Sequence, residues 1–144
     1  MNRQIEIGSA KKHRGIADIE GFVDAGIFRM KGVVAKMPEN EIDQIKNQFI
    51  NKLSPMKIYL FGSFANGTAN EDSDFDFYIV VKDGTENLMD LTVEAYKSIR
   101  SIRNRAVDIV IGTESRFETR KHKLSLENEV MSEGILLFCS CSIR

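Results

Sequence analysis

Residues 57–81, KIYLFGSFANGTANEDSDFDFYIVV, contain two apolar runs separated by a short polar segment. The first run ends at Gly62-Ser63, and the second extends from Phe75 to Val81. Short apolar runs bounded by turn residues are typical of buried β-strands. The stretch therefore predicts two core strands, joined by one short helical turn and a polar loop.

Two carboxylates stand at the start of the second run. Asp74 and Asp76 are two residues apart, and side chains at that spacing on a strand point to the same face. Phe75, Phe77 and Ile79 would then point to the other face, into a core. Neighbouring acids repel each other, and a fold that keeps them together usually places a cation between them. The pair therefore predicts a metal site at one end of the sheet.

Ten residues separate Ser63 from Asp74. An apolar strand, Gly-Ser, this gap and then Asp-x-Asp resemble the signature of the nucleotidyltransferase superfamily that includes DNA polymerase beta. The likeness is greatest to its small single-domain members, the minimal nucleotidyltransferases, and covers about residues 39–138. The resemblance implies an α/β (α+β) fold in which a small mixed sheet is flanked by helices. Many relatives have arginines soon after Gly-Ser, where this chain has Phe64 and Asn66.

A third acid interrupts the apolar stretch 106–111. Taken alone, Asp108 is most simply a strand-end acid exposed to water or ion-paired with Arg105. Family members, however, carry a third acid on a later strand in the same apolar-Asp-apolar setting. The resemblance thus implies that Asp74, Asp76 and Asp108 are the catalytic residues and the ligands of two Mg²⁺ ions, a cation that prefers oxygen ligands.

The resemblance also implies the reaction. An acceptor hydroxyl would attack the α-phosphorus of a nucleoside triphosphate, expected to be ATP, and pyrophosphate would leave. Gly62 and Ser63 would bind the phosphates, because glycine allows close backbone approach and serine adds a hydroxyl and an N–H. Asp108 would hold one metal and help to deprotonate the acceptor. We therefore expect a magnesium-dependent nucleotidyltransferase that moves AMP, with a partner protein as one candidate acceptor.

Two other functions remain open at this stage. Stand-alone minimal nucleotidyltransferases resemble the antitoxin of pairs that include a small helical HEPN-type protein. The chain could therefore be a binding module that neutralises such a partner with little or no catalysis. An enzyme of the aminoglycoside-resistance type is the other alternative, but it generally needs a further helical domain, for which we expect no room after Asp108. Three retained acids favour catalysis over binding alone.

Composition narrows the class of protein. The 144 residues are 42% hydrophobic and 28% charged, which is typical of one ordinary globular domain. The formal net charge of -1 gives no broad basic surface for nucleic acid. No apolar run approaches the roughly 20 residues that span a bilayer. We expect a cytoplasmic protein in which Cys139 and Cys141 are free thiols, and a homo-oligomer remains open.

The remaining elements are predicted from periodicity and turn signals. Residues 1–37 are expected to be an N-terminal extension, a polar tail plus short helices that cover the core or dock a partner, and residues 38–144 the nucleotidyltransferase domain. Helices are expected at 39–53, 63–66, 86–102 and 124–133, a third strand at 106–111, and a last strand or packed tail at 135–138. A basic cluster is interpreted as a solvated helix face, which is commoner than the alternative, a binding patch for a nucleotide or an acidic partner. Its members are Arg116, Arg120, Lys121, His122 and Lys123.

Overall fold

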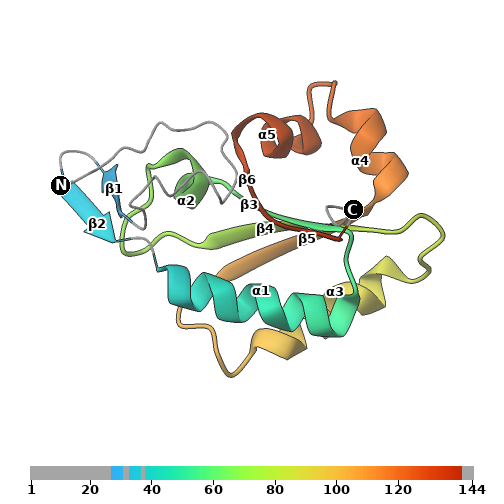
Figure 1. Cartoon of the computed structure of the whole chain (residues 1–144), viewed down its shortest axis with the longest axis horizontal. Coiled ribbons are helices and arrows are strands. Elements are labelled where there is room, and N and C mark those ends of the chain that lie inside the picture. The colour runs from blue at the N-terminus through green and yellow to red at the C-terminus, as the bar shows by residue number, and fades with distance from the viewer. Residues whose placement is uncertain (1–26, 31–32, 37, 141–144) are drawn as a thin grey trace.

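A four-stranded sheet with the strand order β5-β4-β3-β6 forms the centre of the computed structural model (Figure 1), which describes residues 27–30, 33–36 and 38–140. The strands are β1 (Ile27–Met30), β2 (Val33–Lys36), β3 (Lys57–Phe61), β4 (Phe75–Val81), β5 (Val107–Thr113) and β6 (Ile135–Cys139). The helices are α1 (Glu39–Leu53), α2 (Ser63–Asn66), α3 (Leu88–Ile99), α4 (Glu114–Arg120) and α5 (Leu126–Glu133).

The sheet is mixed, as the sequence predicts. β4 pairs antiparallel with β3 and parallel with β5, and β3 pairs antiparallel with β6. β4 is an inner strand, and every residue in it except Asp76 is buried. A continuous apolar run is expected for a strand covered on both faces. The single polar residue of β4 is therefore placed where water can still reach the sheet.

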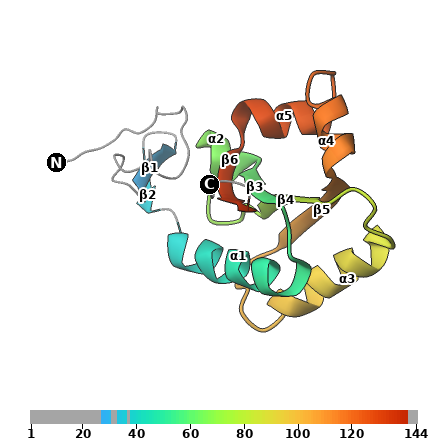
Figure 2. The same ribbon diagram turned by 45° about the vertical axis from the view of Figure 1, so that its right-hand side comes forward.

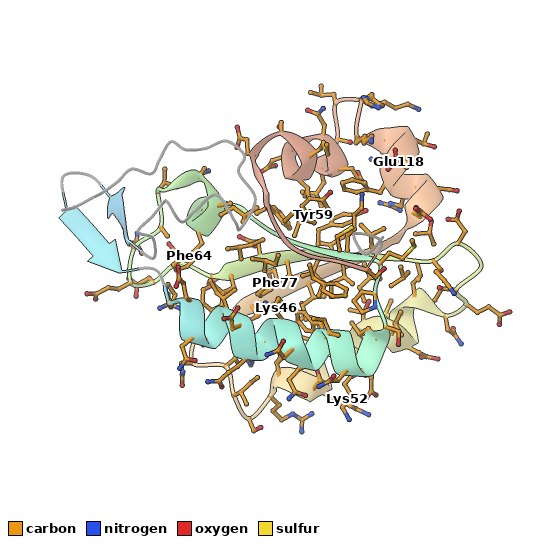
Figure 3. The ribbon with its side chains drawn as sticks, viewed as in Figure 1. Lys46, Lys52, Tyr59, Phe64, Phe77 and Glu118 are labelled. Carbon is orange, nitrogen blue, oxygen red and sulfur yellow. The ribbon has the colours of Figure 1, made fainter. Side chains whose placement is uncertain are left out.

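Helices cover both faces of the sheet (Figure 2). α1 and α3 lie on one face and α4 and α5 on the other. The predicted inward set, Phe75, Phe77 and Ile79, packs on the face of α1 and α3, where Phe77 meets Phe49 edge to face with ring centroids 5.3 Å apart. Figure 3 shows Phe77 on the α1 side of the sheet and Tyr59 on the opposite side. Asp76 consequently faces the side of α4 and α5.

α1 has the predicted length and a different start. It begins at Glu39, and Pro38 occupies the N-cap position, where asparagine is commoner and Asn40 would have been the expected residue. Proline suits a helix start, because its φ is already close to the helical value. The helix ends at Leu53, and Ser54 takes a left-handed conformation with φ 49°. That ending agrees with the restriction that Pro55 places on the residue before it.

The prediction of short helices before residue 38 is wrong where the structure describes that segment. β1 and β2 form a two-stranded antiparallel sheet with Ile27 opposite Lys36 and Met30 opposite Val33. Val33 and Val34 favour strands, and glycine in a short connection such as Lys31-Gly32 favours a hairpin. Residues 1–26 lie outside the described part of the chain, so their predicted tail and helices stay predictions.

Three element boundaries differ from the sequence prediction. α3 is shorter than residues 86–102, because Asn87 before it is left-handed, with φ 56°. α5 begins at Leu126, since the Ser125 side chain accepts the N–H of Asn128 as an N-cap. β5 continues through Gly112 to Thr113, whose hydroxyl caps α4 as predicted. None of the helices in the described residues is long and apolar enough to cross a membrane.

Candidate active site

Gly62 and Asp76 meet where β3 passes into α2. Phe61 pairs with Asp76 across the sheet, so Gly62 follows directly beside the carboxylate. Gly62 has φ 75°, a conformation that other residues rarely adopt. A Cβ atom at this position would collide with Oδ2 of Asp76. Glycine is required here for two reasons, its backbone conformation and the room that it leaves for the acid.

Asp108 is the cross-strand neighbour of Asp76. The parallel pairing of β4 and β5 aligns the two residues in register, so both side chains leave the sheet on the same face. Asp108 is exposed, whereas Asp76 is partly buried. Asp74 lies one residue before β4 begins and is also exposed. The structure therefore brings the three predicted acids to one corner of one sheet face.

Burial and like charges set the electrostatics of this corner. Burial is the largest cause that raises the pKa of Asp76, and the charges of Asp108, Asp74 and Glu129 add to it in that order, to a value of about 6. No cation is among the causes of this shift. A carboxylate that is desolvated and surrounded by acids loses its proton at a higher pH than usual, and a bound cation would favour its ionised form. Such a group is a common mark of a functional site.

The donor chemistry of the corner suits Mg²⁺. Within residues 38–140 and the two short strands, no three His, Cys, Asp or Glu side chains are arranged as a ready metal cage. Mg²⁺ does not need one, because it usually takes one or two carboxylates and completes its shell with water and substrate phosphates. Asp76 and Asp108, neighbours across β4 and β5, are the carboxylates that could bind Mg²⁺ in this way.

Ser63 opens the short helix α2. Its carbonyl accepts the N–H of Gly67 and of Thr68, each at 3.0 Å, which closes the turn after the helix. Ala65 and Asn66 donate to the carbonyl of Gly62, also at 3.0 Å. These bonds hold the Gly62-Ser63 backbone in place beside Asp76. The predicted phosphate-binding pair is thus adjacent to the predicted metal site.

Phe64 and Arg105 explain how the chain differs from its arginine-bearing relatives. Phe64 is buried and packs on Phe75, with ring centroids 4.9 Å apart. The Arg105 guanidinium lies 5.0 Å from the Phe64 ring centroid and 5.1 Å from that of Phe75, within the range of cation–π contact. Nη1 of Arg105 donates to the carbonyl of Ser73 at 3.1 Å. Arg105 therefore braces the residue before Asp74.

Sequence reasoning missed two residues that surround the site. Arg105 was considered as an ion-pair partner of Asp108, but its described polar contacts are with backbone carbonyls, those of Ser73 and, at 3.4 Å, Glu71. Glu129, from α5, adds a fourth negative charge near Asp76. Neither follows from local sequence, because both depend on contacts between distant segments. The one sequence feature that could have indicated the position of Arg105 is the pair of aromatic residues Phe64 and Phe75, because arginine often lies over aromatic rings.

Known structures resemble this fold at low identity. A crystal structure of a toxin–antitoxin with AMP-PNP is 25% identical, with a TM-score of 0.48, and the match covers 72% of this chain and 75% of that one. A mutant of the toxin–antitoxin MntA-HpeT is 23% identical, with a TM-score of 0.46 and coverage of 72% and 74%. A candidate nucleotidyltransferase from Sulfolobus solfataricus is 16% identical, with a TM-score of 0.47 and coverage of 70% and 79%.

The family assignment comes from the sequence of the domain itself. No curated protein matches the chain. The family described as "Nucleotidyltransferase domain" matches residues 42–137. The matched segment runs from α1 into β6, and so includes β3, β4, β5, the start of β6 and all of the acids described above. The chain therefore belongs to the nucleotidyltransferase domain family.

Proposed function

We propose that the chain transfers AMP from ATP to a hydroxyl group, with Asp74, Asp76 and Asp108 acting at the reaction centre. The observation that supports this most is the position of Asp76. Its carboxylate lies against Gly62, beside Asp108 on the next strand, and burial and neighbouring acids raise its pKa. In a nucleotidyltransferase domain this corner is where a triphosphate and its metal would bind.

The proposed reaction is an in-line displacement at the α-phosphorus. The acceptor oxygen forms a new P–O bond, and the bond from the α-phosphorus to the oxygen that bridges it to the β-phosphorus breaks. Pyrophosphate leaves with that electron pair. The hydroxyl proton passes to a carboxylate, and we assign this role to Asp108, which is exposed beside Asp76.

The protein side chains prepare this step through charge and position. Asp76 and Asp108 would hold Mg²⁺, which supplies positive charge to the phosphate oxygens as the P–O bonds change. Gly62 and Ser63 would contact the phosphates through backbone N–H groups and the serine hydroxyl. Arg105 keeps the segment before Asp74 in place through its bond to Ser73. None of these roles requires a conformational change.

We infer that the acceptor hydroxyl belongs to a partner protein. α3 exposes an apolar stripe, with Met89 73%, Val93 45% and Tyr96 39% exposed. Spacings of four and three residues place these side chains on one side of the helix. Exposed apolar clusters of this kind mark contact surfaces. The same stripe supports a second candidate function, a module that binds and neutralises a small helical partner of the HEPN type without catalysis.

The test is label transfer from α-labelled triphosphates. The chain is incubated with Mg²⁺, each of the four nucleotides in turn, and the proteins that co-purify with it from its host. Wild type should transfer label from ATP, and Asp74→Asn or Asp76→Asn should lower the rate at least about 100-fold. Asp43→Asn, an exposed acid on α1, is the matched control and should retain the rate.

A second readout separates the two functions. The Asp74→Asn, Asp76→Asn double variant is compared with wild type for neutralisation of the co-purified partner. If the double variant loses both label transfer and neutralisation, the result supports catalysis. Full neutralisation by the double variant would show that binding alone suffices, and the enzyme proposal would then be wrong.

A further inference from the structure

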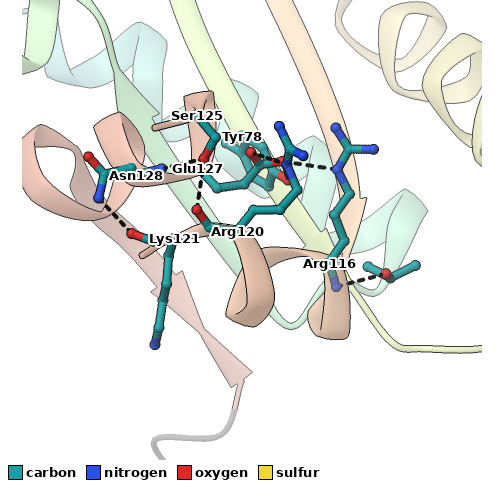
Figure 4. A network of polar contacts seen from close by, with 8 residues as sticks. Tyr78, Arg116, Arg120, Lys121, Ser125, Glu127 and Asn128 are labelled. Carbon is teal, nitrogen blue, oxygen red and sulfur yellow. Dashed lines mark hydrogen bonds and ion pairs between the residues drawn. The ribbon is translucent and has the colours of Figure 1, made fainter. Parts of the chain in front are cut away.

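Glu127 is a buried carboxylate with an unusual number of positive partners. Its side chain is 0% exposed, although it lies near the start of α5. Oε1 accepts the hydroxyl of Tyr78 at 3.0 Å and Nε of Arg116 at 2.9 Å, and Oε2 accepts Nε of Arg120 at 2.9 Å (Figure 4). One negative charge is thus shared by two guanidinium groups.

Two arginines carry more positive charge than is required to neutralise the single carboxylate of Glu127. One arginine can neutralise a carboxylate through two parallel hydrogen bonds, the stronger geometry. Here each arginine uses only Nε, and the side chains of Arg116 and Arg120 remain 54% and 44% exposed. Among the described residues, the contacts with Glu127 engage the Nε atoms of the two arginines, and the Arg116 guanidinium also interacts with the Tyr78 hydroxyl. A surplus positive charge therefore faces water.

The two guanidinium groups are held side by side. Arg116 and Arg120 are four residues apart on α4, a spacing that places them on the same side of the helix. Figure 4 shows their terminal nitrogens directed away from Glu127. Without the shared carboxylate the two charges would repel each other. Glu127 consequently fixes a pair of donors in advance, which lowers the entropic cost of binding an anion.

The surroundings make the pair rigid. The Tyr78 hydroxyl reaches Glu127 across the space beside Gly112, where a Cβ atom would collide with it. Asn128 donates through Nδ2 to the carbonyl of Lys121 at 2.6 Å, and the Ser125 hydroxyl donates to the carbonyl of Arg120 at 2.8 Å. These bonds fix the connection between α4 and α5. The glutamate and both arginines therefore keep their relative positions.

We propose that Arg116 and Arg120 form a binding site for a phosphate group, separate from the carboxylate corner. Two adjacent guanidinium forks match the oxygens of a phosphate monoester or diester better than ammonium groups do. Tyr78 is two residues after Asp76 on β4, so the site lies on the same sheet face as the acids. The phosphate belongs to a nucleotide, to pyrophosphate or to a phosphodiester chain.

The neighbouring cations are not equivalent to this pair. Lys121 already pairs with Glu118, with Nζ and Oε1 2.7 Å apart. Lys123 is exposed in the turn that follows α4. It supplies charge at nearly the same place but has no carboxylate to position it among the described residues. Lys123 therefore offers a matched control for charge without geometry.

The test is calorimetric titration with pyrophosphate in EDTA, where the carboxylate corner cannot contribute through a metal. Arg116→Gln and Arg120→Gln should each weaken binding at least tenfold, while Lys123→Gln should change it less than threefold. Asp76→Asn should bind as tightly as wild type, although it abolishes transfer under the proposed function. Equal affinity for wild type and both arginine variants would overturn the proposal.

A triple variant controls for loss of folding, and two further ligands identify the source of the phosphate. If either glutamine variant melts early, the Arg116→Gln, Arg120→Gln, Glu127→Gln triple variant removes the buried charge as well, and it too should fail to bind. ATP and a single-stranded RNA decamer are titrated in parallel. Arginine-dependent binding of any of the three probes supports the site, and the tightest probe names its source. Binding of none of them by wild type refutes it.

Discussion

Two acids on the same side of the sheet have opposite electrostatic environments. Burial and three other acids raise the pKa of Asp76 to about 6. Burial also opposes ionisation of Glu127, but hydrogen bonds from Arg116, Arg120 and Tyr78 outweigh it and lower the pKa to about 2. The two groups differ in their partners rather than in their chemistry. Burial alone therefore says little about what a carboxylate does.

The difference distinguishes a satisfied acid from an unsatisfied one. Glu127 has its hydrogen bonds within the protein, so its ionised form stabilises the fold. At Asp76, burial and neighbouring acids raise the pKa and no cation of the described residues is among the causes, so its ionised form is costly until a cation binds. An unsatisfied acid of this kind is retained for function rather than for stability.

Removal of the satisfied acid should cost the most. Glu127→Ala leaves two arginines without their shared partner and the buried Tyr78 hydroxyl without its acceptor. Breaking a fully buried pair typically costs about 3–5 kcal/mol, and the loss here should be near the lower end because both arginines are about half exposed and can be rehydrated. The free energy of unfolding from urea titration measures it. Glu129→Ala, on an exposed acid of the same helix, should cost under about 0.5 kcal/mol, and an equal loss would contradict the comparison.

Phe64→Arg should be the next largest effect. An arginine here resembles the relatives, and from sequence alone it should leave transfer unchanged or raise it. The structure predicts otherwise, because the Phe64 ring is buried and the Arg105 guanidinium already lies over it. Loss of the buried ring costs about 2–3 kcal/mol, and two cations would then repel.

The control for Phe64→Arg keeps an apolar side chain. Phe64→Leu loses the cation–π contact but remains buried, so it should cost under about 1.5 kcal/mol. Urea unfolding of the three proteins is the measurement. If Phe64→Arg is as stable as wild type, the surroundings of position 64 adapt easily to a charged side chain and the Arg105 guanidinium does not lie over this position in solution.

Removal of the unsatisfied acid should stabilise the fold. In EDTA at pH 7.5, Asp76→Asn relieves the repulsion and should raise the free energy of unfolding by about 1–2 kcal/mol, allowing for partial exposure of the group. Mg²⁺ should stabilise wild type, because it binds only the native state, and should affect the variant much less. Equal responses of the two proteins to Mg²⁺ would exclude a metal at Asp76.

The two acids should also respond to pH in opposite directions. The pKa of Asp76 is raised from 3.8, so its contribution makes the fold less stable as pH rises from about 4 to 6 and is constant above that. The pKa of Glu127 is lowered from 4.5, so the stability that it contributes is lost as pH falls from about 4.5 to 2. Comparison of wild type with Asp76→Asn across pH 4–7 isolates the first slope.

Features that depend on neighbouring residues in the sequence could be predicted, whereas features that depend on contacts between distant segments could not. The strands around Gly62 and Asp76 follow from local apolar patterns and turn residues, and their pairing puts Asp108 in register. Glu127 could not be recognised, because in the sequence it is one of several acids on an amphipathic helix. Its partner Tyr78 is 49 residues away. No periodicity reports a contact of that kind.

The same reasoning explains the other misses. The phenylalanine at position 64 looks like a lost arginine until Arg105, 41 residues later in the sequence, is found over its ring. The pairing of β1 with β2 was not predicted, because the spacing of apolar residues in this part of the chain also fits a helix. Short segments with glycine give ambiguous periods, and tertiary pairing decides between them. Contacts between distant segments thus account for most of what the sequence left open.

Ser63→Ala should have the smallest effect and tests whether charge or hydrogen bonding carries the candidate site. The variant removes one hydroxyl, while the backbone of Gly62 and Ser63 remains fixed by the bonds that close α2. Loss of one hydrogen bond is worth about 0.5–1.5 kcal/mol, a factor of roughly 2–12 in the transfer rate at low ATP. Asp76→Asn removes a full charge and should cost far more. Equal losses in the two variants would show that phosphate contact at Ser63, and not the unsatisfied acid, dominates the chemistry.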